Sequence, residues 1–186
     1  MAIRKKILLA TKNRGKLVEI RAILGTDHFE FIPVDSIRMF PEIPETGTTF
    51  TENAIIKAKE SFKLTGIPAL ADDSGLWVDC LDGKPGVYSA RYAGENATDD
   101  ENTDKVLEEI KAFNPPYTAK YVCVLAYYDG KETITTEGEC NGELLLEKKG
   151  FNGFGFDPVF KPTGYDETMA ELDPETKNKL SHRFKA

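Results

Sequence analysis

Short apolar runs alternate with amphipathic segments along much of the chain. Runs of this kind are typical of buried strands, and they occur at residues 7–10, 29–34 and 67–71. In other segments apolar side chains recur every three or four residues, which predicts helices over residues 17–24, 50–65 and 99–113. Because strands and helices alternate, the pattern favours an α/β fold.

Capping signals set the limits of the predicted helices. Asn13 is an N-cap residue before the first helix, and Gly25 follows its last apolar position. Thr49–Glu52 and Thr98–Glu101 match the capping box, in which a threonine and a later glutamate satisfy each other's backbone N–H groups. Each box therefore marks the start of a helix.

The second half of the chain begins with a predicted hairpin. Asp129-Gly130 is a strong turn signal, and it separates predicted strands at residues 120–128 and 133–140. Neither strand carries residues from which we expect chemistry. Further along, Asp173-Pro174 opens a short helix.

The apolar run at residues 67–71 leads directly into Asp72, Asp73 and Ser74-Gly75. Strand interiors disfavour Asp, because a buried carboxylate must be paired or must bind a cation. We therefore expect the strand to end at these acids and to place charge at the edge of the sheet, where open α/β sheets bind ligands. The alternative is an Asp-rich turn in which Asp73 caps the following segment.

Composition restricts the class of function. The 186 residues are the length of one domain, or of one domain with two lobes, and we expect residues 1–186 to form a single domain. The formal net charge of −7 argues against a nucleic-acid partner, since gripping that backbone requires a basic face. A local basic pocket for a small phosphorylated ligand is compatible with this charge.

Cysteine usage and hydropathy predict a cytoplasmic protein. Cys80, Cys123 and Cys140 match neither a zinc site nor a disulfide framework, and Cys123 lies in an apolar run typical of a buried free thiol. The apolar stretch at residues 7–10 is too short for the core of a signal peptide. No run is long enough to span a membrane, so we expect no membrane partner.

The polar turn Thr11–Lys16 combines positive charge with a helix start. Unpaired N–H groups at a helix N-terminus attract anions, and Lys12, Arg14 and Lys16 add positive charge. The turn is not a Walker A loop, because no Ser or Thr follows Gly15-Lys16. It predicts a phosphate site, and the alternative is a solvated, capped helix start.

Two stretches near the C-terminus are also unusual. Residues 150–160 are dense in glycine and aromatic residues, which suits close approach to a ligand and stacking on a flat ring. The alternative is a loop that lines the core. Ser181-His182-Arg183 lies in a polar segment, so we do not expect His182 on an apolar face. No Ser–His–Asp triad and no zinc cluster can be assembled from the sequence.

These stretches together suit an anionic ligand that carries a ring and is held by lysines and a divalent cation. Carboxylate and phosphate oxygens are the hard ligands that Mg²⁺ prefers. The residues therefore indicate a nucleotide-binding, metal-dependent enzyme.

Six motifs follow one another in order over nearly the whole chain. They are Thr11–Lys16; Glu45-Thr46-Gly47 with Glu52-Asn53-Ala54 and Lys57; Ala71–Leu76; Pro85–Tyr92; Phe154–Pro158; and Ser181-His182-Arg183. In this order they resemble the Ham1-like inosine triphosphate pyrophosphatases, the family of non-standard purine nucleoside triphosphate (dITP/XTP) pyrophosphatases.

This resemblance implies hydrolysis of ITP, dITP and XTP to the nucleoside monophosphate and pyrophosphate, which removes deaminated purines from the nucleotide pool. It implies Mg²⁺ as cofactor and a homodimer as the assembly. The fold that it implies is α/β, a long twisted mixed β-sheet flanked by helices, with two lobes around a central nucleotide-binding cleft.

The resemblance also assigns roles to residues. Asp73 would orient or deprotonate the attacking water, and Glu45 and Asp73 would hold the metal. Substrate binding would fall to Thr11, Asn13, Lys16 and Lys57 at the triphosphate, Phe154 and Asp157 at the base, Lys177, His182 and Arg183 at the purine 6-oxo group, and Ser74. Such donors satisfy a 6-oxo oxygen but not the 6-amino group of adenine. Guanine must be rejected around its 2-amino group.

Other functions stay open. A pyrophosphatase of the related Maf type would prefer dTTP or UTP, and the Ser181-His182-Arg183 ending argues against it. A non-catalytic nucleotide sensor would bind ITP without turnover, and the presence of both Glu45 and Asp73 argues against that. The sequence leaves open whether Asp72 or Asp79 shares the metal.

Overall fold

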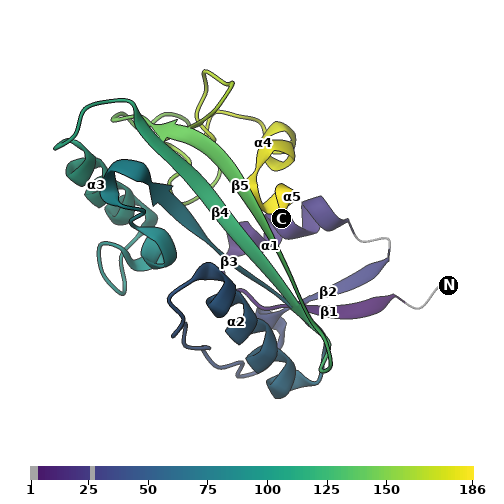
Figure 1. Ribbon diagram of the computed structural model, residues 1–186. Coiled ribbons are helices and arrows are strands. Elements are labelled where there is room, and N and C mark those ends of the chain that lie inside the picture. Colours follow the sequence, from purple (N-terminus) through teal and green to yellow (C-terminus); the bar gives the residue numbers. More distant parts are fainter. Residues whose placement is uncertain (1–3, 26–27) are drawn as a thin grey trace. The chain divides into compact units, whose positions relative to one another are not determined.

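The computed structural model describes residues 4–25 and 28–186. Residues 1–3, which begin the segment weighed as a signal peptide, lie outside the described residues. A six-stranded sheet has the order β2-β1-β3-β4-β5-β6 (Figure 1). Its strands are β1 (Lys5–Leu9), β2 (Phe29–Pro33), β3 (Ala69–Val78), β4 (Tyr117–Tyr128), β5 (Thr133–Leu144) and β6 (Phe160–Pro162). The α-helices are α1 (Arg14–Leu24), α2 (Phe50–Thr65), α3 (Asp99–Ile110), α4 (Pro174–Leu180) and α5 (His182–Lys185), with 3₁₀ turns η1 (Val34–Ser36), η2 (Asp79–Leu81) and η3 (Gly86–Arg91).

The sheet is mixed, as predicted. β1 pairs in parallel with both β2 and β3, whereas β5 and β6 pair antiparallel. Leu8 in β1 lies opposite Ile32 on one side and Ala69 on the other. Figure 1 shows β4 and β5 as long, twisted strands side by side, and the turn at residues 129–132 joins them as the predicted hairpin.

The chain divides into two compact units. Unit 1 consists of Met1–Asp73 and Cys123–Glu137 with Ala186, and unit 2 consists of Ser74–Val122 and Gly138–Lys185. The first boundary falls within β3, between Asp73 and Ser74. Each unit contains part of the residues predicted to form the site.

In unit 1, apolar clusters pack the helices onto the strands. One cluster joins α1 to β1 and β2 through Leu9, Leu17, Ile20 and Phe31. Another joins α2 to β3 and β4 through small side chains, among them Ala54, Ala58, Ala71 and Ala126. Because these side chains are small, the backbone of α2 can approach β3 closely. This approach brings Lys57 of α2 within reach of Asp73 on β3.

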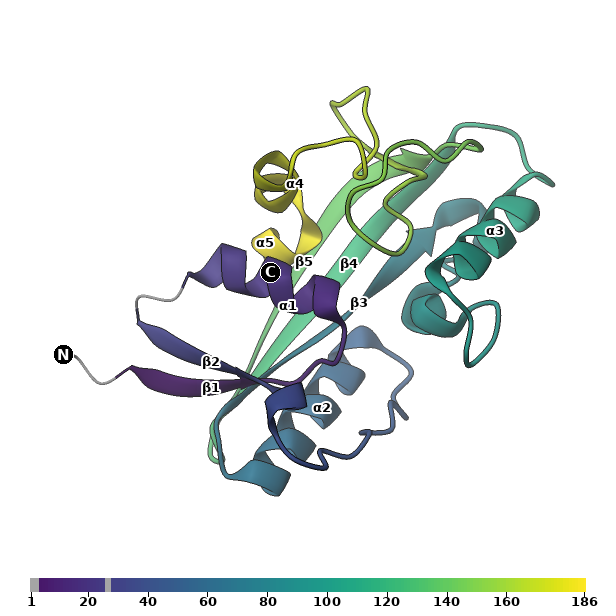
Figure 2. The ribbon, with the colours of Figure 1, turned by 180° about the vertical axis from the view of Figure 1, so that it is seen from behind.

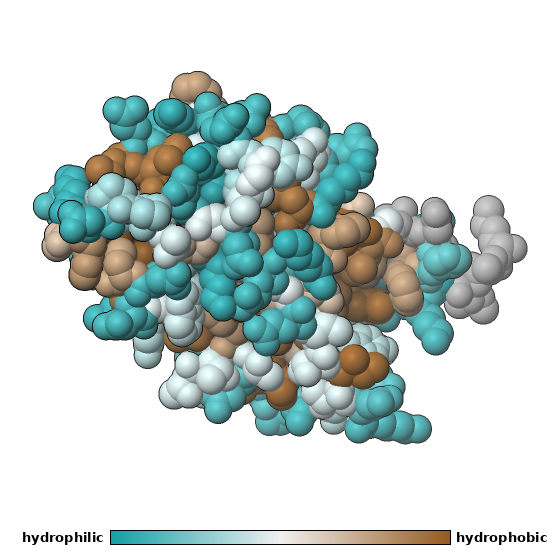
Figure 3. Space-filling view, turned by 45° about the horizontal axis from the view of Figure 1, so that its top comes forward, coloured by the Kyte–Doolittle hydropathy of each residue, from teal (hydrophilic) through white to brown (hydrophobic). Residues whose placement is uncertain are grey.

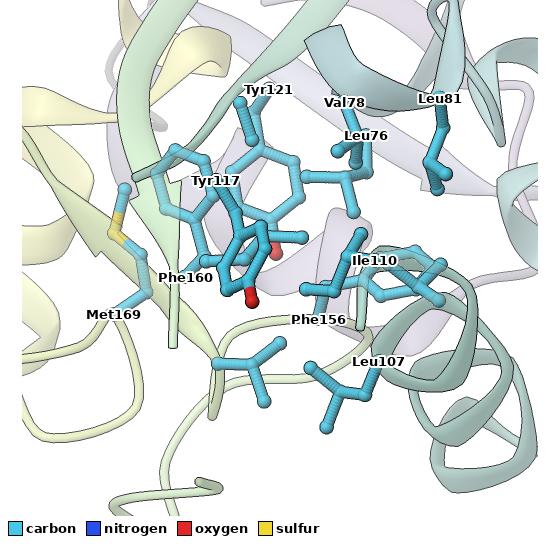
Figure 4. Close-up of a cluster of buried hydrophobic side chains, with 14 of the residues drawn as sticks. Leu76, Val78, Leu81, Leu107, Ile110, Tyr117, Tyr121, Phe156, Phe160 and Met169 are labelled. Atoms are coloured by element: carbon cyan, nitrogen blue, oxygen red, sulfur yellow. The ribbon is translucent and has the colours of Figure 1, made fainter. Parts of the chain in front are cut away.

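Unit 2 contains one large hydrophobic cluster (Figure 4). It joins β3, β4 and α3 to the segment that carries Phe156 and Phe160. Two tyrosines of β4, Tyr117 and Tyr121, belong to this cluster and are each 7% exposed. The C-terminal helices α4 and α5 lie next to each other in the same unit (Figure 2).

Helix ends agree with the capping signals of the sequence. Both predicted capping boxes form, at Thr49–Glu52 and at Thr98–Glu101. α1 ends at Leu24 and is capped by Gly25, whose φ of 66° is in a region that glycine adopts more readily than other residues. The third predicted helix is shorter than expected, since α3 ends at Ile110 and Phe113 beyond it is 45% exposed.

The prediction that a strand ends at Asp72 is wrong, and so is the alternative in which Asp73 caps a turn. β3 continues through both acids and through Ser74-Gly75 to Val78. Both carboxylates are buried in this strand, but each has a lysine partner. Ion pairing removes the penalty on which the prediction relied.

Hydrophilic and hydrophobic side chains are interspersed over the face seen in Figure 3. Within residues 4–25 and 28–186, no helix combines the length and the hydropathy needed to cross a membrane.

Candidate active site

The turn before α1 and the first turn of this helix hold three of the predicted substrate-binding residues, all in unit 1. Asn13 caps the helix, because its side-chain oxygen accepts a hydrogen bond from the backbone N–H of Lys16 at 3.0 Å. The hydroxyl of Thr11 accepts a hydrogen bond from the N–H of Asn13 at 3.2 Å and so fixes the turn. No acid lies in the first turn of α1, a helix that the structure describes in full. The helix start and Lys16 can therefore attract an anion together.

Asp72, one of the two acids weighed as a further metal ligand, is 1% exposed in β3. One of its carboxylate oxygens pairs with the ammonium group of Lys16. The other accepts a hydrogen bond from the thiol of Cys123 at 3.2 Å. Cys123 is a buried free cysteine, as predicted, and it contacts the ion pair that orients Lys16.

Asp73 is the next residue of β3 and is 5% exposed. Its Oδ1 atom lies 2.7 Å from Nζ of Lys57, and the same Nζ lies 2.7 Å from Oε1 of Glu45. The ammonium group thus lies between the two predicted metal ligands, Glu45 and Asp73, and offsets the repulsion between their negative charges. Oδ2 of Asp73 is buried and has no hydrogen-bond partner among the described residues.

Burial and charge act in opposite directions on this group of residues. Burial tends to lower the pKa of Lys57, but the charges of Asp73 and Glu45 outweigh it and hold that pKa above its ordinary value. Burial raises the pKa of Asp73, although the charges of Lys57 and Lys16 oppose the rise. A raised pKa makes a carboxylate a stronger base, which suits proton transfer from water.

The loop that carries Glu45 is anchored on the first turn of α2. Asn53 is fully buried, and its side-chain oxygen accepts a hydrogen bond from the N–H of Gly47 at 2.8 Å. A Cβ atom at position 47 would lie 2.7 Å from that same oxygen, so only glycine fits there. Gly47 and Asn53 belong to one of the motifs of the sequence. In the structure, the hydrogen bond between them fixes the loop that carries Glu45.

In unit 2 the carboxylate of Asp157 organises the predicted base-binding residues. Asp157 is 4% exposed. Its Oδ2 accepts hydrogen bonds from the backbone N–H of Phe154 at 2.8 Å and from Nζ of Lys177 at 2.7 Å. Gly153, with a φ of 80°, passes so close to this carboxylate that a Cβ atom would collide with it.

Three aromatic residues of the glycine-rich loop divide between the two predicted roles, whereas Phe151 is fully exposed. Phe156 and Phe160 are buried members of the unit 2 core, as the alternative interpretation expected. Phe154 is only half-buried, and its ring centroid lies 5.1 Å from Nζ of Lys177. A partly exposed aromatic ring offers a face on which a base can stack.

α4 and α5 supply the remaining predicted residues. Asp173 caps α4, which presents Lys177. Arg183 is 2% exposed, and its Nη2 donates a hydrogen bond to the hydroxyl of Ser74 at 2.9 Å. The prediction that His182 avoids an apolar setting is wrong. His182 is 8% exposed and stacks on the ring of Tyr121, with centroids 4.8 Å apart.

The structure thus groups the predicted residues in two sets. Unit 1 contains Thr11, Asn13, Lys16, Glu45, Lys57 and Asp73, and unit 2 contains Ser74, Phe154, Asp157, Lys177, His182 and Arg183. Asp79, the other acid weighed as a metal ligand, accepts a hydrogen bond from the hydroxyl of Thr118 at 2.8 Å.

Although the sequence predicts no chemistry for the hairpin strands, β4 contacts Asp72 and two of the predicted substrate-binding residues. Cys123 of this strand contacts Asp72, and Tyr121 contacts Asp157 and His182. Both residues lie in an apolar run. The thiol of Cys123 and the hydroxyl of Tyr121 were the only features of that run that could have indicated polar contacts. Pairing of β4 with β3, which brings Cys123 to Asp72, is not encoded in any local pattern.

Comparison with known proteins places the chain. The model of the Ham1 family matches residues 7–186. The dITP/XTP pyrophosphatase of Oceanobacillus iheyensis is 48% identical over 185 residues, which cover 98% of this chain and 94% of that protein. The dITP/XTP pyrophosphatase of Geobacter sulfurreducens is 48% identical over 185 residues, covering 97% and 92% of the two chains.

A solved structure of a HAM1 protein from Coxiella burnetii has a TM-score of 0.88 and 45% sequence identity, over 97% of this chain and 93% of that chain. Family model, sequence and structure agree over nearly the full length of the chain. The chain therefore belongs to the Ham1 family.

Proposed function

We propose that the chain hydrolyses the non-standard purine nucleoside triphosphates ITP, dITP and XTP to the monophosphate and pyrophosphate, and so removes deaminated purines from the nucleotide pool. The names of its close relatives support the reaction class and the substrates. The single structural observation that carries the proposal is Asp73, a buried carboxylate with one oxygen on Lys57 and the other without a hydrogen-bond partner among the described residues.

Cleavage between the α- and β-phosphates requires stabilisation of the charge on the leaving pyrophosphate. Lys16 and the N–H groups at the start of α1 would bind phosphate oxygens, with Thr11 and Asn13 fixing the turn. Lys57 would add a second positive charge. Both lysines are held by buried carboxylates, which limits the entropy lost when they bind a phosphate.

The reaction also requires an oriented water molecule. Oδ2 of Asp73 can accept a hydrogen bond from that water, and the carboxylate can then take its proton. Lys57 on Oδ1 keeps the carboxylate from rotating. The raised pKa of Asp73 makes the proton transfer easier than for an exposed aspartate.

The residues present also fit a magnesium ion. Glu45 and Asp73 would hold it, since both offer hard oxygen ligands and one oxygen of Asp73 has no hydrogen-bond partner in the described part of the chain. Among the described residues, no group of three or more His, Cys, Asp or Glu side chains is placed to hold a metal ion by itself. Such a sparse set suits Mg²⁺, which proteins often hold by one or two carboxylates together with substrate phosphates. When bound, the ion neutralises phosphate charge.

The unit 2 residues suit recognition of the base. The half-buried ring of Phe154 would stack on the purine, and Lys177, His182 and Arg183 would face its 6-oxo oxygen as donors. Adenine offers a 6-amino group there, which leaves buried donors unpaired at a cost of about 1–3 kcal/mol. We also propose that residues 1–186 work as one domain and that the chain acts as a cytoplasmic homodimer.

A substrate panel tests the proposal. Pyrophosphate and orthophosphate release should be measured with ITP, XTP, ATP, GTP and dTTP, each with and without Mg²⁺. We expect pyrophosphate from ITP and XTP only, and only with the metal. Preference for dTTP would indicate a Maf-type activity, and tight ITP binding without product would indicate a sensor. Release of orthophosphate in place of pyrophosphate would show that the enzyme does not cleave between the α- and β-phosphates.

A further inference from the structure

Tyr121 of β4 lies among the residues that would recognise the base, although no motif contains it. It is 7% exposed and belongs to the hydrophobic cluster of unit 2 (Figure 4). Its ring packs against that of Phe160, with centroids 4.4 Å apart. The core therefore holds the Tyr121 ring in place. The contacts of Tyr121 with Asp157 and His182 start from a fixed side chain.

The hydroxyl group of Tyr121 lies 3.3 Å from Oδ1 of Asp157 and donates a hydrogen bond to it. The other oxygen of this carboxylate accepts from the N–H of Phe154 and from Nζ of Lys177. Tyr121 thus donates to one carboxylate oxygen, Oδ1, while Phe154 and Lys177 donate to the other, Oδ2. Rotation of Asp157 would release both of these residues at once.

The ring of Tyr121 also supports His182. The two rings stack with centroids 4.8 Å apart and an angle of 21° between their planes. Stacking of this kind fixes the plane of the imidazole and so the direction in which its nitrogens point. A hydrogen bond to a base edge depends on that direction.

We propose that Tyr121 is a positioning residue for base recognition. Its hydroxyl fixes Asp157, and with it Lys177 and Phe154, while its ring fixes His182. This inference rests on the proposed function and deepens it. It names one side chain that aligns Lys177 and Phe154, through Asp157, and also His182. It gives Tyr121 no contact with the reacting phosphates.

Two substitutions separate the hydroxyl from the ring. Tyr121→Phe removes only the hydroxyl, so we expect the KM for ITP to rise roughly 3- to 10-fold with little change in kcat. The selectivity for ITP over ATP should fall by a similar factor. Tyr121→Leu also removes the stacked ring and should cause a larger loss in both.

Tyr117→Phe is the matched control. Tyr117 lies in the same strand and the same core and is equally buried, but its hydroxyl faces the backbone carbonyl of Phe113 at 3.4 Å. We expect this variant to keep the wild-type KM and selectivity. Inhibition by inorganic triphosphate, which carries no base, should be unchanged in Tyr121→Phe, whereas general damage to the fold would weaken it.

Calorimetric binding of IMP makes the test independent of turnover. Weaker IMP binding by Tyr121→Phe than by Tyr117→Phe supports the inference even if wild-type protein releases no pyrophosphate, a result that would overturn only the proposed reaction. Equal IMP affinity in wild type and Tyr121→Phe would overturn the inference. Absence of IMP binding by wild type would overturn it too, because the unit 2 residues would then not form a base site.

Discussion

The ammonium group of Lys57 lies 2.7 Å from Oδ1 of Asp73, and both side chains are largely buried. This ion pair makes an aspartate acceptable within a strand of the sheet. It also leaves a carboxylate that has only one of its oxygens engaged with the described residues, which is the arrangement that the proposed hydrolysis needs.

Replacing Lys57 by methionine should destabilise the protein. The substitution leaves Asp73 and Glu45 close together without their shared cation. Removing one partner of a buried pair costs roughly 3–5 kcal/mol, and we expect a loss of this order in urea unfolding with EDTA present.

Lys63→Met is the control for this prediction. Lys63 lies on the same helix, but its pair with Glu60 is exposed, with the charged atoms 3.4 Å apart. Exposed pairs contribute about 0–1 kcal/mol, so this variant should remain near wild type. Equal losses in the two variants would contradict the role given to Lys57.

The thiol of Cys123 should affect triphosphate binding through Asp72. Cys123→Ala removes the hydrogen bond to the carboxylate that orients Lys16. We expect inorganic triphosphate to inhibit this variant several-fold more weakly, since a less constrained lysine loses more entropy on binding.

Cys140→Ala, which removes a buried thiol in unit 2, should leave the inhibition constant for triphosphate unchanged. If both cysteine variants respond alike, general loosening of the core would explain the result, and the link from Cys123 to Lys16 would be wrong.

We expect the buried thiol of Cys140 to make the folded protein less stable at alkaline pH. Burial raises the pKa of its thiol from 9.0 to about 11. Between these pH values the folded chain retains a proton on this thiol that the unfolded chain releases. The contribution of Cys140 to the free energy of unfolding is therefore fully present below pH 9 and is lost as the pH rises toward 11. The loss is at most about 2–3 kcal/mol. Urea unfolding at pH 8 and at pH 11 should show a smaller difference for Cys140→Ala than for wild type. Identical differences in the two proteins would contradict this.

Gly153→Ala should impair base recognition. A Cβ atom at this position would collide with Oδ2 of Asp157, the atom that holds Phe154 and Lys177. Gly164 also has a positive φ, of 89°, but a Cβ atom there would meet nothing within 4 Å. Gly164→Ala therefore carries the same kind of backbone strain without the collision. We expect the KM for ITP to rise about tenfold more in Gly153→Ala, and equal KM values in the two variants would contradict the account.

Local patterns were sufficient for most of the fold. The caps at Asn13, Thr49 and Thr98 and the turn at Asp129-Gly130 depend on a few adjacent residues, and the structure confirms them. The course of β3 could not be predicted in this way. Whether a strand tolerates Asp73 depends on Lys57, which reaches it only after α2 has packed on the sheet.

The candidate site divides in the same manner. Residues in motifs, such as Lys16 and Arg183, could be named from the sequence because their family resemblance identifies them. Tyr121 and Cys123 could not, since they sit in an apolar run whose pattern is that of any buried strand. Their contacts with Asp157 and Asp72 arise from the tertiary structure.

The most direct test of the account compares ITP hydrolysis by wild type with that by Asp73→Asn in the presence of Mg²⁺. Asp79→Asn is the control, because the side chain of Asp79 accepts a hydrogen bond from Thr118 in unit 2. We predict that Asp73→Asn releases pyrophosphate at least about 100-fold more slowly, while it still unfolds cooperatively and still binds IMP. Asp79→Asn should retain nearly full activity. Near-normal turnover by Asp73→Asn would contradict the central claim that this carboxylate carries the reaction.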